Sequence, residues 1–147
     1  MPLLNYTTKI DVEKTIGEIQ RMLGKAGAMK IMTDYDEGVI SALSFALNVN
    51  GQTIGFRLPC DWRPVQEVLK RHKANTSGRK DKIKTDQVQS VRVAWRIVKD
   101  WVEAQLALVE TQMVKTEQVF LPYMVVKGGK TLYENMVDAQ FRLGDGK

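Results

Sequence analysis

The chain has 147 residues, of which 44% are hydrophobic and 27% are charged. This composition is typical of a globular protein of one domain, and it excludes a disordered or fibrous chain. A single cysteine, Cys60, and a single histidine, His72, exclude an intramolecular disulfide, a cysteine-rich zinc site and a multi-histidine metal site. We therefore expect no metal and no cofactor, and a binding protein rather than an enzyme.

Two segments indicate where in the cell the protein is expected. Residues 1–14 lack a basic stretch followed by an apolar one, so no secretory signal is expected. The most apolar segment, Val91 to Val109, contains five charged residues and does not match a membrane span of roughly 20 apolar residues. We therefore expect a cytoplasmic protein with no membrane partner.

The first third of the chain predicts a helix followed by a strand. Apolar residues recur at helical spacing from Val12 to Leu23, with Asp11 placed to cap the helix and Gly24 and Gly27 placed to end it. From Ala28 to Tyr35 the pattern changes to alternation, which is typical of a half-buried strand. This alternation predicts that Met29, Ile31 and Thr33 share one face.

A β-hairpin is predicted next. Asn50-Gly51 is a strong two-residue turn signal between strands at Val39 to Val49 and Gln52 to Leu58. A turn of this length sets the register, so Phe45 should face Phe56, and Leu43 should face Leu58. The opposite face, with Ser44 beside Arg57, is small and polar and is expected to be open to solvent or to a partner.

The second half of the chain predicts helices. Asp61 and Pro64 mark the start of a helix to about His72, and Asp86 caps a long helix from about Gln87 to Val114. The long helix is apolar on two sides, so we expect either the C-terminal segment or a second copy of the chain to cover it. That pattern predicts a homo-oligomer through residues 87–114.

Two further elements are expected. One is a short helical turn near Thr116. The other is a last helix from Leu132 to Leu143, which Thr131 caps and which packs on the long helix. The fold class is α+β: a helix, a three-stranded antiparallel sheet, a helix, a long helix and a short final helix. We expect one domain over residues 1–147, with an α-β-β-β-α unit (11–73), a basic mobile loop (74–86) and a helical extension (87–143).

The usual catalytic patterns are not met. Cys60 and His72 lie at opposite ends of one predicted helix, roughly 15–18 Å apart. Asp34, Asp36 and Glu37 cluster in a predicted turn, but the two following strands carry no acidic residue, so an acidic metal site across strands is not expected. The GGKT sequence at 128–131 resembles the end of a phosphate-binding loop but lacks the first glycine of that motif.

One segment is strongly basic. The window from Lys70 to Lys84 carries a charge of +6, whereas the whole chain carries +5, so the other 132 residues sum to −1. Flexible lysines of this kind suit contact with phosphates, and a solubilising loop is the alternative. The candidate nucleic-acid-binding residues of this segment are Lys70, Arg71, Lys73, Arg79, Lys80, Lys82 and Lys84.

Aromatic residues beside basic ones would favour binding of single strands, because bases stack on exposed rings. Trp62, between Arg57 and Arg63 in the sequence, is the best candidate for an exposed ring, and these three residues extend the predicted surface. Trp95 and Trp101 lie at helical spacing and are expected in the core.

The order helix, three antiparallel strands, helix over Asp11 to Lys73 resembles the double-stranded-RNA-binding domain in topology. That resemblance implies recognition of duplex RNA by shape and 2′-OH contacts. The family has a lysine cluster at the start of its second helix, whereas this chain reads Asp61-Trp62-Arg63-Pro64 there and gathers its basic residues past the helix end.

A second resemblance covers most of the chain. The segments VEKTIGEIQRML, FRLPCDWRPV, AWRIVKDWVEAQLALVE and VFLPYM are similar to a group of small proteins from phage and prophage-like regions of bacterial genomes. This resemblance implies a phage or mobile-element accessory protein in the host cytoplasm. Two functions remain open: binding of single- or double-stranded nucleic acid, and inhibition of an anionic host or defence protein.

Overall fold

The computed structural model describes residues 2–76, 78 and 83–144 of the chain. It confirms the α+β class. In chain order the elements are α1 (Val12–Lys25), β1 (Met29–Asp36), β2 (Val39–Val49), β3 (Gln52–Pro59), α2 (Trp62–Asn75), α3 (Gln87–Glu110), α4 (Thr116–Val119), the 3-10 helix η2 (Leu121–Tyr123) and α5 (Leu132–Asp138).

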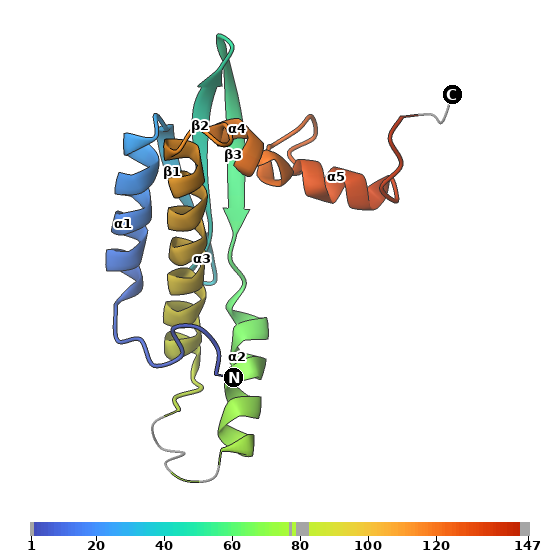
Figure 1. Ribbon diagram of the computed structural model, residues 1–147. Helices are drawn as coiled ribbons and strands as arrows, with labels where there is room; N and C mark the ends of the chain where they lie inside the picture. Colours follow the sequence, from blue (N-terminus) through green and yellow to red (C-terminus); the bar gives the residue numbers. More distant parts are fainter. Residues whose placement is uncertain (1, 77, 79–82, 145–147) are drawn as a thin grey trace.

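The molecule has two layers. The antiparallel sheet, in the order β1-β2-β3, forms one layer, and α1 and α3 lie side by side across one of its faces (Figure 1). Helix α2 continues from the end of β3 and packs against α3 beyond the ends of the strands (Figure 1). No described helix is long and apolar enough to cross a membrane.

The β2–β3 hairpin has the predicted register. Phe45 pairs with Phe56, Leu43 with Leu58, and the turn is Asn50-Gly51, where both residues have positive φ. The rings of Phe45 and Phe56 stack with centroids 5.3 Å apart. This hairpin places its large apolar side chains under the helices, which is why one face of the sheet forms the core.

Strand β1 differs from the alternation that the sequence predicts. The register shifts between Met29 and Met32, and Lys30, which lies between them, has φ 53°. Such a bulge inserts a residue and moves the preceding side chain to the other face. Met29 is therefore paired with Ala46 and exposed on the outer face, and the prediction that it shares a face with Thr33 is wrong.

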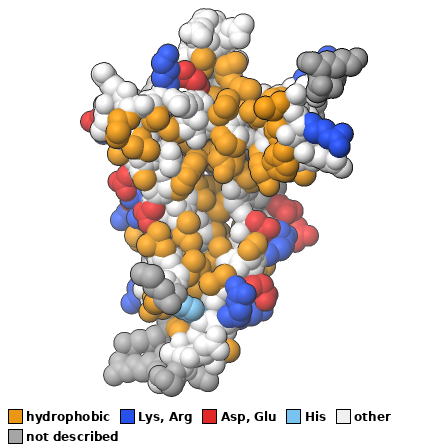
Figure 2. Space-filling model, turned by 45° about the vertical axis from the view of Figure 1, so that its right-hand side comes forward, with side chains coloured by type: hydrophobic (Ala, Val, Ile, Leu, Met, Phe, Trp, Pro, Cys, Tyr) orange, Lys and Arg blue, Asp and Glu red, His pale blue; other side chains and the backbone are white. Residues whose placement is uncertain are grey.

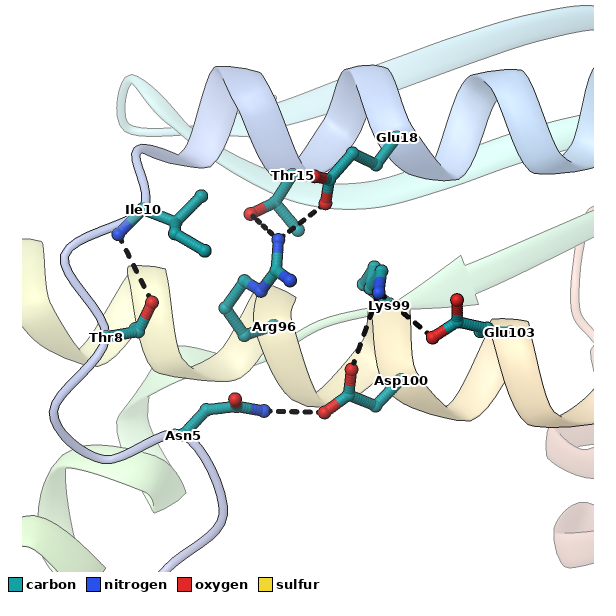
Figure 3. Close-up of polar contacts among 9 residues, drawn as sticks. All are labelled: Asn5, Thr8, Ile10, Thr15, Glu18, Arg96, Lys99, Asp100 and Glu103. Atoms are coloured by element: carbon teal, nitrogen blue, oxygen red, sulfur yellow. Dashed lines mark hydrogen bonds and ion pairs between the residues drawn. The ribbon is translucent and has the colours of Figure 1, made fainter.

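A polar row on α3 ties down the N-terminal part of the chain. Arg96 donates hydrogen bonds to Thr15 and, at 2.5 Å, to the carboxylate of Glu18, which joins α3 to α1 (Figure 3). Asn5 donates to the carboxylate of Asp100. The side chain of the buried Gln89 donates to two carbonyl groups of the N-terminal segment. These contacts hold residues 5–11 along α3.

The N-terminus of α1 and the C-terminus of α3 differ from the prediction. Asp11 lies at the N-cap of α1, but its carboxylate forms an ion pair with Arg92 instead of accepting a backbone N–H. Helix α3 ends at Glu110, four residues before the predicted end at Val114. Gln112 has φ 65°, a conformation that a helix does not continue through.

The C-terminal segment takes a different path from the predicted one. Phe120 is fully buried among the rings of Phe45, Phe56 and Trp101. After it, Met124 forms an isolated bridge with Phe56, on the edge of β3. Helix α5 then packs against η2 and extends away from the body, so the prediction that it packs on the long helix is wrong.

Candidate nucleic-acid interface

Four of the candidate binding residues that the structure describes lie at the end of the molecule where α2 finishes and α3 begins. Lys70, Arg71 and Lys73 are exposed on the second half of α2, and Lys84 is exposed just before α3. We call these four residues the basic end. Arg79, Lys80 and Lys82, the remaining candidates of the predicted loop, lie outside the described residues.

Contacts within the fold fix the two segments that carry the basic end. Gln66 on α2 donates a hydrogen bond to the carbonyl of Thr85, and Ile83 is buried, so the chain that carries Lys84 returns along α2. Thr76 donates to the carbonyl of His72 at the end of α2. Asp86 then caps α3 by accepting from the backbone N–H of Gln89. The positions of Lys84 and Lys73 thus follow from packed structure.

The basic end is not neutralised by its own surroundings. None of its four residues forms an ion pair with another described residue, whereas Arg57, Arg63, Arg92, Arg96, Lys99 and Lys130 all do. Cations in the last turn of a helix favour the helix dipole, which accounts for Lys73 structurally. It does not account for Lys84, which precedes the N-terminus of α3.

Sequence reasoning missed one residue of this region. Gln89, in the first turn of α3, holds the carbonyl of Thr8, and the next residue, Lys9, is exposed and forms no ion pair within the described ranges. Lys9 is therefore an exposed cation next to a residue that is held at the first turn of α3. No local signal in the sequence predicts this placement, because the hydrogen bond between the buried Gln89 and Thr8 spans 81 residues.

The other three candidates lie near the opposite end of α2. Arg57 donates a hydrogen bond of 2.6 Å to the carbonyl of Gly129 and lies 3.5 Å from the carboxylate of Glu134. Arg63 forms ion pairs with Asp36 and Asp61. Both arginines are thus engaged within the fold, and at 1.5 Å per residue α2 separates Arg63 from Lys73 by about 15 Å.

Trp62 is less exposed than the sequence suggested. Its side chain is half-buried and packs against the core, and the guanidinium of Arg63 lies 5.4 Å from the centre of its ring. The ring is therefore already covered on part of its surface. Trp95, expected in the core, is buried, and Trp101 packs against the core in a half-buried position.

The remaining chemical candidates are spatially separate. Cys60 precedes α2 and His72 is in its last turn, so the pair is held apart by the helix, as predicted. His72 is half-buried, and its ring lies 5.7 Å from that of Tyr6 in an edge contact. Among the residues that the structure describes, no three His, Cys, Asp or Glu side chains come close enough together to hold a metal ion.

Burial controls the chemistry of Cys60. It raises the pKa of the thiol from 9.0 to about 12, with a smaller contribution from the negative charge of Asp61. At pH 8 we expect Ellman's reagent to modify the native thiol roughly 10³-fold more slowly than the unfolded one, because only the thiolate reacts. Labelling of the folded protein at the unfolded rate, with an unchanged circular dichroism spectrum, would contradict this.

The raised pKa of Cys60 also predicts that the free energy of unfolding depends on pH. The native thiol keeps its proton while the unfolded thiol loses it above about pH 9, so rising pH favours the unfolded state. The contribution of Cys60 to the free energy of unfolding should therefore decline between about pH 9 and pH 12. Cys60→Ala is the control, because it removes this part of the dependence and leaves that of the other groups.

Comparison of the chain with models of protein families, with curated proteins and with solved structures found no significant match.

Proposed function

We propose that this protein binds nucleic acid, without catalysis, through the basic end, as an accessory protein of a phage or mobile element. The observation that carries the proposal is the set of exposed cations at one end of the fold that have no carboxylate partner in the described chain. Lysines and arginines of this kind bind phosphates and release counterions from the nucleic acid.

The arrangement favours the phosphate backbone over the bases. Lysine is a flexible point charge, and three of the four residues at the basic end are lysines. Trp62 is half-buried and lies at the other end of α2, so it adds no stacking surface beside these lysines. Binding with little sequence preference and strong dependence on salt is therefore the expected behaviour.

Fluorescence anisotropy with labelled single-stranded and duplex oligonucleotides tests the proposal. We expect binding at low micromolar protein in 50 mM salt, and roughly 10²-fold weaker binding in 200 mM salt if about four phosphates are contacted. Absence of binding to either oligonucleotide at low salt would refute the proposal. An anionic protein partner, which the same charges could steer, would then be the better hypothesis.

A pair of matched variants locates the binding surface. Arg71→Glu with Lys73→Glu reverses two charges at the basic end, and we expect at least a tenfold loss of affinity at low salt together with a shallower salt dependence. Arg21→Glu with Lys25→Glu makes the same charge change at the far end of α1, on exposed residues that form no ion pair with another described residue. Equal losses for the two variants would show that net charge, and not the basic end, drives binding.

A further inference from the structure

The C-terminal part of the chain forms an arm that projects from the body. We define the arm as residues 121–144, which include η2 and α5 and lie to one side of the sheet and of α3 (Figure 1). Its large apolar side chains are exposed to the extent of 45% at Leu121, 55% at Tyr133, 45% at Val137, 59% at Phe141 and 86% at Leu143. An apolar surface this exposed on a folded segment is typical of an interface.

The root of the arm is held firmly, so the arm is not a loose tail. Arg57 on β3 contacts both the carbonyl of Gly129 and the carboxylate of Glu134. Thr131 and Glu134 form a reciprocal capping box at the start of α5. The hydrogen bonds from Thr131 lower the pKa of Glu134, which stays ionised toward Arg57. These contacts direct α5 away from its own chain.

The chain that follows α5 has an unusual backbone conformation that fixes the position of Phe141. Gln140 and Phe141 have φ 54° and 61°, where a residue other than glycine is strained. Their backbone N–H groups donate to Val137 and Met136, which closes the helix and turns the chain back. The ring of Phe141 consequently lies 6.2 Å from that of Tyr133, so the two aromatic side chains form one patch.

An apolar groove lies beside the root of the arm. Its volume is about 220 Å³, and it is lined only by uncharged, mainly apolar side chains from β3, α3 and η2: Leu58, Pro59, Ile97, Val98, Trp101 and Tyr123. A cavity of about 150 Å³ is enough to hold benzene, so this groove has room for a phenyl ring. Apolar side chains extend from the arm across the body below it (Figure 2).

A second hollow on the molecule differs from this groove in the charge of its lining residues. The hollow between the C-terminal ends of α1 and α3 carries Lys25, Glu103 and Glu110 on its rim. A charged rim suits solvent or a polar partner, whereas the groove beside the arm presents no charge. Trp101 and Ile97 in that groove belong to the second apolar side of α3. Tyr123, at the root of the arm, covers part of Trp101 with a ring contact of 5.6 Å, and the groove beside it stays open.

We propose that the arm of one copy of this protein docks in the groove of a second copy, and that the second copy returns the contact. Tyr123 belongs both to the arm and to the wall of the groove, so arm and groove form one continuous patch. A two-fold interface requires such a self-complementary patch, in which each copy supplies both halves.

The area available matches what a stable dimer needs. At about 150–250 Å² for a large aromatic side chain and somewhat less for Leu and Val, the exposed apolar surface of the arm amounts to roughly 500 Å². Covering it hides a similar area of the partner, so two reciprocal contacts bury about 2,000 Å² in total. Specific protein interfaces bury about 1,200–2,000 Å².

The mass in solution gives the first test. We expect light scattering at tens of micromolar protein to give twice the chain mass of 16.7 kDa. Val137→Glu places a charge in the middle of the apolar patch of the arm and should reduce the mass to that of one chain. Val88→Glu is the matched control, since Val88 is 60% exposed at the start of α3, and it should leave the dimer intact. A monomeric native protein, or a dimer that survives Val137→Glu, would overturn the proposal.

Disulfide trapping gives the second test and identifies the contact. A chain with Val137→Cys is mixed with a chain of different mass that carries Ile97→Cys, and a mild oxidant is added; the buried Cys60 stays unmodified. We expect a disulfide between the two different chains. Pairs formed only between identical chains would show that arms meet arms or grooves meet grooves, which contradicts the proposal.

Discussion

Replacement of Phe120 by alanine should lower the free energy of unfolding by about 3–5 kcal/mol, the range found when a buried phenylalanine is truncated. Phe120 is 0% exposed, and its ring lies 5.2 Å from that of Phe45 and 5.7 Å from that of Trp101. It is the residue through which the C-terminal segment enters the core. Its loss removes contacts to the sheet and to α3 together, and leaves a cavity among three aromatic rings.

Urea unfolding followed by circular dichroism measures this loss, at one protein concentration for all variants because any self-association adds to stability. Limited proteolysis adds a local readout, since cleavage by trypsin after Lys127 should become faster when Phe120 no longer anchors the segment. Met113→Ala is the control: its side chain is 66% exposed, and its truncation should cost less than about 0.5 kcal/mol. A cost below 1 kcal/mol for Phe120→Ala would mean that the segment is not part of the core.

Trp95→Ala is expected to have a similarly large effect, about 3–5 kcal/mol. Trp95 is 1% exposed in the middle of α3, and its indole N–H donates a hydrogen bond of 3.0 Å to the carbonyl of Ile40 on β2. The substitution therefore opens a cavity between helix and sheet and leaves a carbonyl without its donor. The two costs have different physical origins, and a second variant separates them.

Trp95→Phe keeps much of the volume but removes the donor, and we expect it to cost about 1–3 kcal/mol. Circular dichroism is the appropriate signal, because the substitution itself changes the tryptophan fluorescence. Val88→Ala, on an exposed position of the same helix, should change stability by less than about 0.5 kcal/mol. If Trp95→Phe cost as much as Trp95→Ala, volume would be irrelevant and the assignment of Trp95 to the packed core would fail.

The parts of the fold that the sequence predicted well depend on local signals. The turn at Asn50-Gly51 and the alternation around it are enough to set the pairing of Phe45 with Phe56. The caps of α2 and α3 are likewise visible in the sequence, because Asp61 and Asp86 each accept from a backbone N–H two or three residues ahead. In these regions, short-range chemistry and tertiary structure agree.

The failures occur where a distant contact overrides the local pattern. Nothing near Asp11 indicates that its carboxylate will bind Arg92, 81 residues away. The path of α5 depends on Arg57, whose place on the outer face was predicted but whose partner, the carbonyl of Gly129, was not. The bulge at Lys30 was missed for another reason, because a positive φ at lysine carries no signature in composition or spacing.

The candidate interface shows the same division. The concentration of charge between Lys70 and Lys84 is a property of the sequence, and the structure adds that α2 and α3 bring its two ends together. The ion pairs that Arg57 and Arg63 form with carboxylates could be seen only in the structure. The position of Thr8 and the following Lys9 beside the first turn of α3, which a buried glutamine determines, could likewise be seen only in the structure.

The bridge between Met124 and Phe56 also concerns how the chain folds during synthesis. Strand β3 is an edge strand, and Val125 donates to the carbonyl of Gly55 on that edge only after most of the chain has been made. Until Phe120 emerges, a nascent chain has an open aromatic cluster and a bare strand edge, both of which promote aggregation. We therefore expect a chain that terminates before residue 120 to aggregate rather than to fold as a smaller version of the protein.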